Sequence, residues 1–262
     1  MDLKNKVILI SGASSGMGRE IVRILSNEEC KLALFSRREK KLEEISKELK
    51  ENNIESIYKK CDVKNKLEIK NAIDLTYETY GKIDVAILAA GILIPNPLQN
   101  FDSNIIKDSI EVNFLGNVYF IEYLLNKMKS QKSGTIAVTS TLPDKRGVPG
   151  WGAYGASKAA LSWFLESLRA EAKQEYNINI ITIKPGSVET PMIEEYHRKG
   201  AISAYQAADI IIKGIKKEKK IIQFPFFQVL MTRTMDKFPN FVYDKLDIDL
   251  QKGDGYPKIK EY

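Results

Sequence analysis

The fold is decided by the stretch Ser11-Gly12-Ala13-Ser14-Ser15-Gly16-Met17-Gly18. It joins an apolar run, Val7–Ile10, to an amphipathic stretch, Met17–Asn27, which is the order strand, glycine turn, helix. The three glycines permit a tight turn, a close approach of backbone to phosphate, and close packing of the helix. Free amides at the helix start favour a pyrophosphate. The pattern therefore predicts a phosphate-binding turn; a glycine-rich turn without a ligand is the alternative.

Short apolar runs alternate with longer amphipathic stretches over about the first 220 residues. This alternation is typical of a parallel sheet that is covered by helices on both faces. The predicted strands are Val7–Ile10, Lys31–Ser36, Glu55–Lys60, Asp84–Ala89, Thr135–Thr139, Asn179–Lys184 and Lys220–Gln223. The predicted helices are Met17–Asn27, Glu39–Glu51, Lys66–Tyr80, Ser103–Lys129, Tyr154–Tyr176 and Ala204–Lys217. We therefore predict a doubly wound α/β fold in three layers.

The length of 262 residues allows one large domain or two small ones, and the hydrophobic content of 44% excludes a disordered chain. Because no linker interrupts the sequence, one domain is favoured. We expect this domain to span residues 1–223 and a C-terminal extension to span residues 224–262. The extension is expected to pack on the same domain or on a partner subunit. The least regular parts of the chain are Leu142–Gly152, Ser187–Gly200 and everything after Phe224.

The charged and metal-binding residues exclude several classes of protein. A single histidine and two cysteines rule out a multi-histidine metal site and a disulfide scaffold, so no metal is expected. The net charge of +6 comes from lysines that are interleaved with acids, so we expect no nucleic-acid partner. No apolar run approaches the roughly 20 residues that span a bilayer, and the N-terminus lacks a signal-peptide core. These features predict a cytoplasmic protein.

The end of the second predicted strand indicates which nucleotide binds. A site for NAD usually has an acid there, which holds the ribose 2′-hydroxyl. This chain has Phe35-Ser36-Arg37-Arg38 instead. Ser36 can donate a hydrogen bond to a 2′-phosphate and Arg37 can pair with it in a fork, whereas Arg38 is expected to begin a solvated helix. The sequence favours NADP over NAD.

A tyrosine and a lysine open the helix that runs to Tyr176. Because Tyr154 and Lys158 are four residues apart, their side chains share one face of that helix. A nearby cation favours the phenolate form and lowers the tyrosine pKa from about 10, which would make the phenol an effective acid–base catalyst. Taken alone, such a pair is also common as a structural feature. Its place after the fifth strand puts it at the same sheet edge as the glycine turn.

Together these motifs resemble the short-chain dehydrogenase/reductase superfamily, in the order in which its members carry them. The resemblance covers about residues 4–223. It implies a single-domain Rossmann fold that transfers a hydride between NAD(P) and a carbonyl or alcohol. Dimers and tetramers are usual in this family, so a homodimer or homotetramer is expected.

The resemblance also implies individual roles. Tyr154 would be the proton donor, Lys158 would lower its pKa and hold the nicotinamide ribose, and Asn113 would hold a water in the proton relay. Asp62 would contact the adenine amino group, although an aspartate there also fits a helix cap. The implied cofactor-binding residues are Gly12, Ser14, Ser15, Gly16, Met17, Gly18, Ser36, Arg37, Asp62, Val63, Ala90, Gly91, Tyr154, Lys158, Pro185, Gly186, Val188 and Thr190.

Two places depart from the family pattern. The family's catalytic serine lies about 13 residues before the tyrosine, and here that spacing reaches Thr141, with Ser140 one residue earlier. Adjacent strand residues point opposite ways, so we expect Thr141 to face the cleft and keep Ser140 as the alternative. The second departure is Leu88-Ala89-Ala90-Gly91, which keeps the glycine of the usual Asn-Asn-Ala-Gly and loses both amides. We expect function to survive this loss.

Family analogy places the substrate among loops with an apolar lining, which suggests a hydrophobic carbonyl or alcohol as substrate. The candidate lining residues are Leu93, Pro143, Trp151, Met192, Ile193 and Tyr196; His197 is expected to be a surface residue. Two other functions are open: a non-catalytic NADP-binding protein, and a peripheral membrane reductase of lipid carbonyls. The second would contact lipid through apolar residues within 224–243, which follow several lysines. Packing of this segment against protein is favoured.

Overall fold

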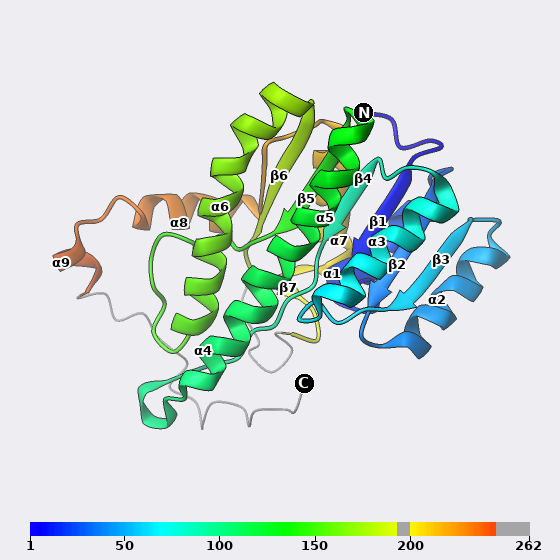
Figure 1. The fold of residues 1–262 in the computed structure, drawn as a ribbon. Helices are drawn as coiled ribbons and strands as arrows, with labels where there is room; N and C mark the ends of the chain where they lie inside the picture. Colours follow the sequence, from blue (N-terminus) through cyan, green and yellow to red (C-terminus); the bar gives the residue numbers. More distant parts are fainter. Residues whose placement is uncertain (193–199, 245–262) are drawn as a thin grey trace.

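The computed structural model describes residues 1–192 and 200–244. A seven-stranded sheet in the order β3-β2-β1-β4-β5-β6-β9 forms its centre, and every neighbouring pair of strands is parallel (Figure 1). The strands are β1 (Val7–Ser11), β2 (Lys31–Ser36), β3 (Ser56–Lys60), β4 (Val85–Leu88), β5 (Gly134–Thr139), β6 (Ile178–Pro185) and β9 (Ile221–Phe224). Two short strands, β7 (Val188–Glu189) and β8 (Ile202–Ser203), pair separately. The predicted doubly wound α/β fold is confirmed.

Helices cover both faces of the sheet. The α-helices of the described residues are α1 (Gly16–Leu25), α2 (Glu39–Glu51), α3 (Lys66–Tyr80), α4 (Ser103–Ile110), α5 (Gly116–Gln131), α6 (Gly152–Tyr176), α7 (Ala204–Lys216), α8 (Phe226–Met235) and α9 (Asn240–Tyr243). The side chains of α1, α2 and α7 belong to one buried cluster, and those of α3, α5 and α6 belong to the other. None of the helices in the described part of the chain is both long and apolar enough to cross a bilayer.

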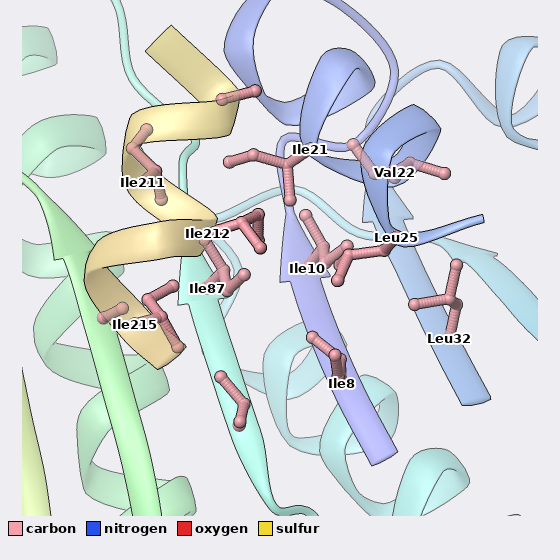
Figure 2. Packing of buried hydrophobic residues seen from close by; sticks show 14 of the residues in the cluster. Ile8, Ile10, Ile21, Val22, Leu25, Leu32, Ile87, Ile211, Ile212 and Ile215 are labelled. Atoms are coloured by element: carbon pink, nitrogen blue, oxygen red, sulfur yellow. The ribbon is translucent and has the colours of Figure 1, made fainter. Parts of the chain in front are cut away.

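The alternation of side chains along β1 builds the two halves of the core. Ile8 and Ile10 enter the cluster under α1 and α7, whereas Leu9 enters the cluster on the opposite face. Figure 2 shows how the isoleucines of α7 pack over β1 and β4, beside Ile21 and Val22 of α1. Fully burying each such side chain contributes about 1.5–3 kcal/mol. The core therefore fixes the carboxyl end of β1, from which the glycine turn starts.

Polar residues begin two of these helices. The side chain of Asn65 accepts hydrogen bonds from the amides of Leu67 and Glu68, and that of Asp102 accepts one from Asn104. Asp62 does not cap α3; its carboxylate accepts a hydrogen bond from the amide of Lys64 at 3.0 Å.

The prediction of one continuous helix over Ser103–Lys129 is wrong in its middle. Residues Glu111–Leu115 form a π-helical turn between α4 and α5. Such turns occur mostly as single insertions inside α-helices, often at functional sites. Asn113, a predicted site residue, lies in this turn and is fully buried.

The expectation of an irregular chain after Phe224 is also wrong for residues 226–243, the part of this segment in which the structure describes helices. Residues Phe226–Met235 form α8, which has no buried residue, and a short α9 follows it. Figure 1 shows both helices extending away from the sheet. The large apolar side chains of this segment face solvent; they are Phe226, Phe227, Leu230, Met231 and Phe241.

Candidate active site

A groove at the carboxyl end of the sheet is built around the turn between β1 and α1. Gly12 has a φ of +75°, and a Cβ there would lie 2.8 Å from the backbone nitrogen of Ala90. A Cβ on Gly18 would collide with the carbonyl oxygen of Gly12. Only glycine therefore allows β1, the turn and the start of α1 to pack this closely.

Residues from several strand ends line this groove. Most predicted cofactor residues lie there: Gly12, Ser14, Ser15, Gly16, Met17, Gly18, Ser36, Arg37, Asp62, Val63, Ala90, Gly91 and Thr190. Of the described residues, Pro185, Gly186, Val188, Tyr154 and Lys158 do not line it. Lining residues that were not predicted to bind the cofactor are Ser11, Phe35, Arg38, Cys61, Ala89, Ile92, Val112, Phe120, Pro191 and Met192.

The polar groups of the groove fit a dinucleotide. The hydroxyl of Ser11 is buried and makes no hydrogen bond within the described chain. A buried polar atom without a partner costs about 1–3 kcal/mol, and a polar ligand in the groove would offset that cost. Among the described lining residues Asp62 is the only acid, so the groove suits an anion.

Arg38 lies on the glycine turn, and the expectation that it starts a solvated helix is incomplete. Its Nε donates to the hydroxyl of Ser14 at 3.0 Å, and its Nη2 donates to the hydroxyl of Ser15. Partial burial, together with the charge of Arg37, lowers the pKa of Arg38. Two neighbouring guanidinium groups thus face the groove, where an anion between them would relieve their repulsion.

Lys158 is buried behind the groove. Its Nζ donates to the carbonyl oxygen of Thr139 at 2.7 Å. It makes no ion pair with any residue that the structure describes. Burial lowers the pKa of this amine from 10.5 to about 7. Holding such a group in the interior is unfavourable, which is typical of a functional residue.

Asn113 connects the loop after β4 with the start of α6. Its Oδ1 accepts from the amide of Ile92 and its Nδ2 donates to the carbonyl of Ile92, both at 2.9 Å. The Nδ2 also donates to Ser157 at 3.0 Å, and the Ser157 hydroxyl donates to the backbone carbonyl of Tyr154 at 2.7 Å. The π-helical turn therefore aims one amide at the two segments that carry Gly91 and Tyr154.

The side chains of Asn113 and Lys158 both lie close to Gly91. A Cβ on Gly91 would lie 3.0 Å from Oδ1 of Asn113 and 3.5 Å from Nζ of Lys158. Tyr154 lies one helical turn before Lys158 on α6. The structure thus brings Gly91, Asn113, Tyr154 and Lys158 to the edge of the sheet where the groove opens.

The two candidate hydroxyls after β5 differ in their surroundings. The hydroxyl of Ser140 donates to the carbonyl of Lys158 at 3.0 Å and shares a hydrogen bond with Ser162 at 2.7 Å. Ser140 thus faces the body of α6. Thr141, the next residue, is also buried, at 5% exposure.

The loop over residues 142–151 is held from two sides. Lys184 of β6 forms a buried ion pair with Asp144 at 2.5 Å. Arg146 donates to Asn240 at 2.6 Å and to the carbonyl of Phe238, and it lies over the ring of Tyr243. Neither attachment was predicted, because each joins residues that are far apart in the sequence.

The proposed substrate lining is only partly placed. Met192 lines the groove. Leu93 and Trp151 are buried but do not line it. Pro143 follows Leu142 in the loop that Lys184 and Arg146 hold. The candidates Ile193, Tyr196 and His197 lie outside the described residues. No cluster of potential metal ligands occurs among the residues that the structure describes.

Comparisons with known proteins agree with this architecture. The family described as short chain dehydrogenase matches residues 6–200. An uncharacterised oxidoreductase of Listeria monocytogenes is 38% identical over 195 residues, which is 74% of this chain and 79% of the relative. Dehydrogenase/reductase SDR family member 7B of Mus musculus is 30% identical over 235 residues, 83% of this chain and 72% of the relative.

Solved structures share the fold. An alcohol dehydrogenase from the archaeon Thermococcus sibiricus, complexed with 5-hydroxy-NADP, is 26% identical with a TM-score of 0.76, and covers 84% of this chain and 95% of its own. A short chain dehydrogenase/reductase from Burkholderia phymatum, in complex with NAD, has a TM-score of 0.84 over 89% of this chain and 93% of its own. At 21% identity the latter shows the fold alone.

Proposed function

Because the chain belongs to the short-chain dehydrogenase/reductase superfamily, we propose that it is an NADP(H)-dependent oxidoreductase acting on a hydrophobic carbonyl or alcohol. The coarser part of this statement rests on the comparisons: the chain is an oxidoreductase of that family, and a nicotinamide cofactor fits it. The finer part is supported by the site. The observation that carries it is the buried Lys158 one helical turn after Tyr154.

Four residues of this chain have separate roles in the proposed acid–base catalysis. A nicotinamide held in the groove would supply the chemistry of hydride transfer. Tyr154 gives its phenolic proton to the carbonyl oxygen during reduction and takes it back during oxidation. The ammonium form of Lys158 favours the phenolate and holds the nicotinamide ribose. The Thr141 hydroxyl orients the substrate oxygen, and Asn113 holds the loop after Gly91 and takes part in the proton relay.

A turnover assay tests this function. Oxidation of NADPH is followed with a panel of apolar ketones and aldehydes, and the reverse reaction with the matching alcohols. We expect turnover that requires Tyr154 and is faster with NADPH than with NADH. Tight NADPH binding without any Tyr154-dependent turnover would instead support a non-catalytic NADP-binding protein.

The preference for NADP is tested at the two adjacent arginines. Arg37→Ala and Arg38→Ala should each raise KM for NADPH by roughly 10–100-fold, since a charge-assisted hydrogen bond contributes about 1.5–3 kcal/mol. KM for NADH should stay within about threefold of the wild type, because NADH lacks the 2′-phosphate. Lys40→Ala, an exposed residue in the first turn of α2, is the control. Equal losses with both cofactors would contradict a 2′-phosphate site here.

The roles of the two hydroxyls after β5 are separable. Thr141→Val should lower kcat by about 100-fold, the usual effect of removing one hydrogen-bond donor to a developing oxyanion. Ser140→Ala should lower the free energy of unfolding by about 1–3 kcal/mol, because it removes buried hydrogen bonds, while kcat of the folded protein changes by less than about threefold. Steady-state kinetics and urea unfolding measure both. The opposite pattern would make Ser140 the substrate-binding residue.

The proposed partners follow from the same surfaces. The substrate is a small hydrophobic molecule, and the protein is a cytoplasmic homodimer or homotetramer. The apolar side chains on α8 and α9 support a subunit contact, because such patches on a monomer usually mark an interaction site. The same side chains are compatible with a lipid surface, so a membrane-associated lipid-carbonyl reductase is the second candidate.

A further inference from the structure

One side chain of α8 joins the segment before β7 to the segment before β8. The amide of Ser187 donates to Oε1 of Gln228 at 2.8 Å. The Nε2 of Gln228 donates to the carbonyl oxygen of Gly200 at 2.9 Å. A single glutamine therefore uses its acceptor and its donor on two segments that are 13 residues apart in the sequence.

The backbone around this contact is closely packed. The amide of Gly186 donates to the carbonyl of Phe224 at 2.7 Å, and the amide of Ile202 donates to the carbonyl of Ser187 at 3.2 Å. A Cβ on Gly186 would collide with Oε1 of Gln228. Gly186 was predicted as a cofactor residue; in the structure its lack of a side chain makes room for Gln228.

This contact lies a few residues from the cofactor groove. The chain leaves Ser187 through β7 and reaches Thr190, which lines the groove. The side chain of Thr190 lies against the glycine turn, since a Cβ on Gly16 would be 3.3 Å from its Cγ2. Thr190 therefore follows the anchored residue Ser187 closely in the chain and lies against Gly16.

We propose that Gln228 is a positioning residue for the cofactor: by holding Ser187 and Gly200 together, it keeps Thr190 against the groove. Gln228 itself does not line the groove. The C-terminal segment thus contributes to dinucleotide binding indirectly, through the position of Thr190. The inference rests on the nicotinamide cofactor of the proposed function and adds a residue outside the matched family region, which ends at residue 200.

The test compares two substitutions with a control on the same helix. Gln228→Ala loses both hydrogen bonds and should raise Kd for NADPH about tenfold. Gln228→Glu keeps the acceptor for the Ser187 amide and loses the donor to Gly200, so about a threefold rise is expected. The control is Thr234→Ala, whose exposed hydroxyl donates to the carbonyl of Leu230 within α8; its Kd should equal that of the wild type.

Binding is measured by fluorescence titration and accompanied by hydrogen exchange of the cofactor-free protein. In Gln228→Ala, exchange should accelerate in peptides over residues 186–192 and stay unchanged over residues 226–235. Steady-state kinetics should show a larger change in KM for the cofactor than in kcat. Wild-type affinity in Gln228→Ala overturns the proposal. So does equal acceleration over α8, which would show that the glutamine merely anchors the helix.

These outcomes are distinguishable from failure of the proposed function. If the wild type binds NADH more tightly than NADPH, the cofactor preference is wrong, and the same comparison is made with NADH. If the wild type binds a dinucleotide without turnover, the catalytic proposal is wrong, and the binding and exchange measurements still decide the role of Gln228.

Discussion

Replacing Tyr154 by phenylalanine should lower kcat by about a thousandfold. Phenylalanine keeps the ring and its packing but has no proton to exchange with the substrate oxygen, and general acid–base catalysis contributes about 10²–10⁴-fold. Because Tyr154 does not line the groove around the glycine turn, Kd for NADPH should change by less than about threefold. Single-turnover kinetics and fluorescence titration measure the two effects separately.

A second tyrosine on the same helix is the matched control. Tyr176 ends α6 at the opposite end, under Lys129, and Tyr176→Phe should leave kcat unchanged. If Tyr154→Phe retained more than a tenth of wild-type kcat, the phenol would not be the acid–base group.

The second large effect is expected for Lys158→Met, which should lower kcat and raise the free energy of unfolding of the cofactor-free protein. Without the cation, Tyr154 loses the group that favours its phenolate, so kcat should fall by at least about 100-fold. The cofactor-free protein should become more stable below pH 7, because burial makes the ammonium form of Lys158 unfavourable in the folded state. The gain should be a few kcal/mol, at about 1.4 kcal/mol per pKa unit.

The pH dependence of this gain follows from the lowered pKa. Below about pH 7 Lys158 is protonated in both states, and the full cost of burying the charge applies. Between about 7 and 10.5 the unfolded state binds more protons than the folded state, so the wild type gains stability as the pH rises. The advantage of Lys158→Met should therefore shrink over this range.

Urea unfolding at several pH values measures the difference. Lys173→Met, an exposed position on the same helix, should show no such trend. A constant difference between wild type and Lys158→Met from pH 6 to pH 9 would contradict the lowered pKa.

Most of the fold could be predicted because its signals are local. Alternating apolar runs and amphipathic stretches located the seven strands of the main sheet. The π-helical turn could not be predicted, since residues Glu111–Leu115 have the same pattern as the helices around them. Helix α8 was missed because its apolar side chains face solvent and provide no inward apolar face.

The candidate site divides in the same way. The glycine turn, Ser36 and Arg37 lie in short motifs that the sequence shows directly, whereas Asp62 was implied by the family resemblance; all of them line the groove. Arg38 and Gln228 make contacts that depend on tertiary structure, across 24 residues in one case and 41 in the other. Sequence spacing carries no signal for such contacts. For Arg38, the sequence offered one indication of a place at the groove, namely its position next to Arg37.

The π-helical turn also makes the length of this helix part of the site. A π turn holds one residue more than an α-helical path between the same ends, and each residue of an α-helix advances the side chains by about 100°. If the same residues were all wound as a regular α-helix, the side chains of α5 would be rotated against those of α4 by about that angle. Asn113 could then no longer reach both Ile92 and Ser157. The extra residue shifts the directions in which the side chains point along the helix. The side chains of α5 can therefore pack on the sheet while Asn113 holds the segments of the active site.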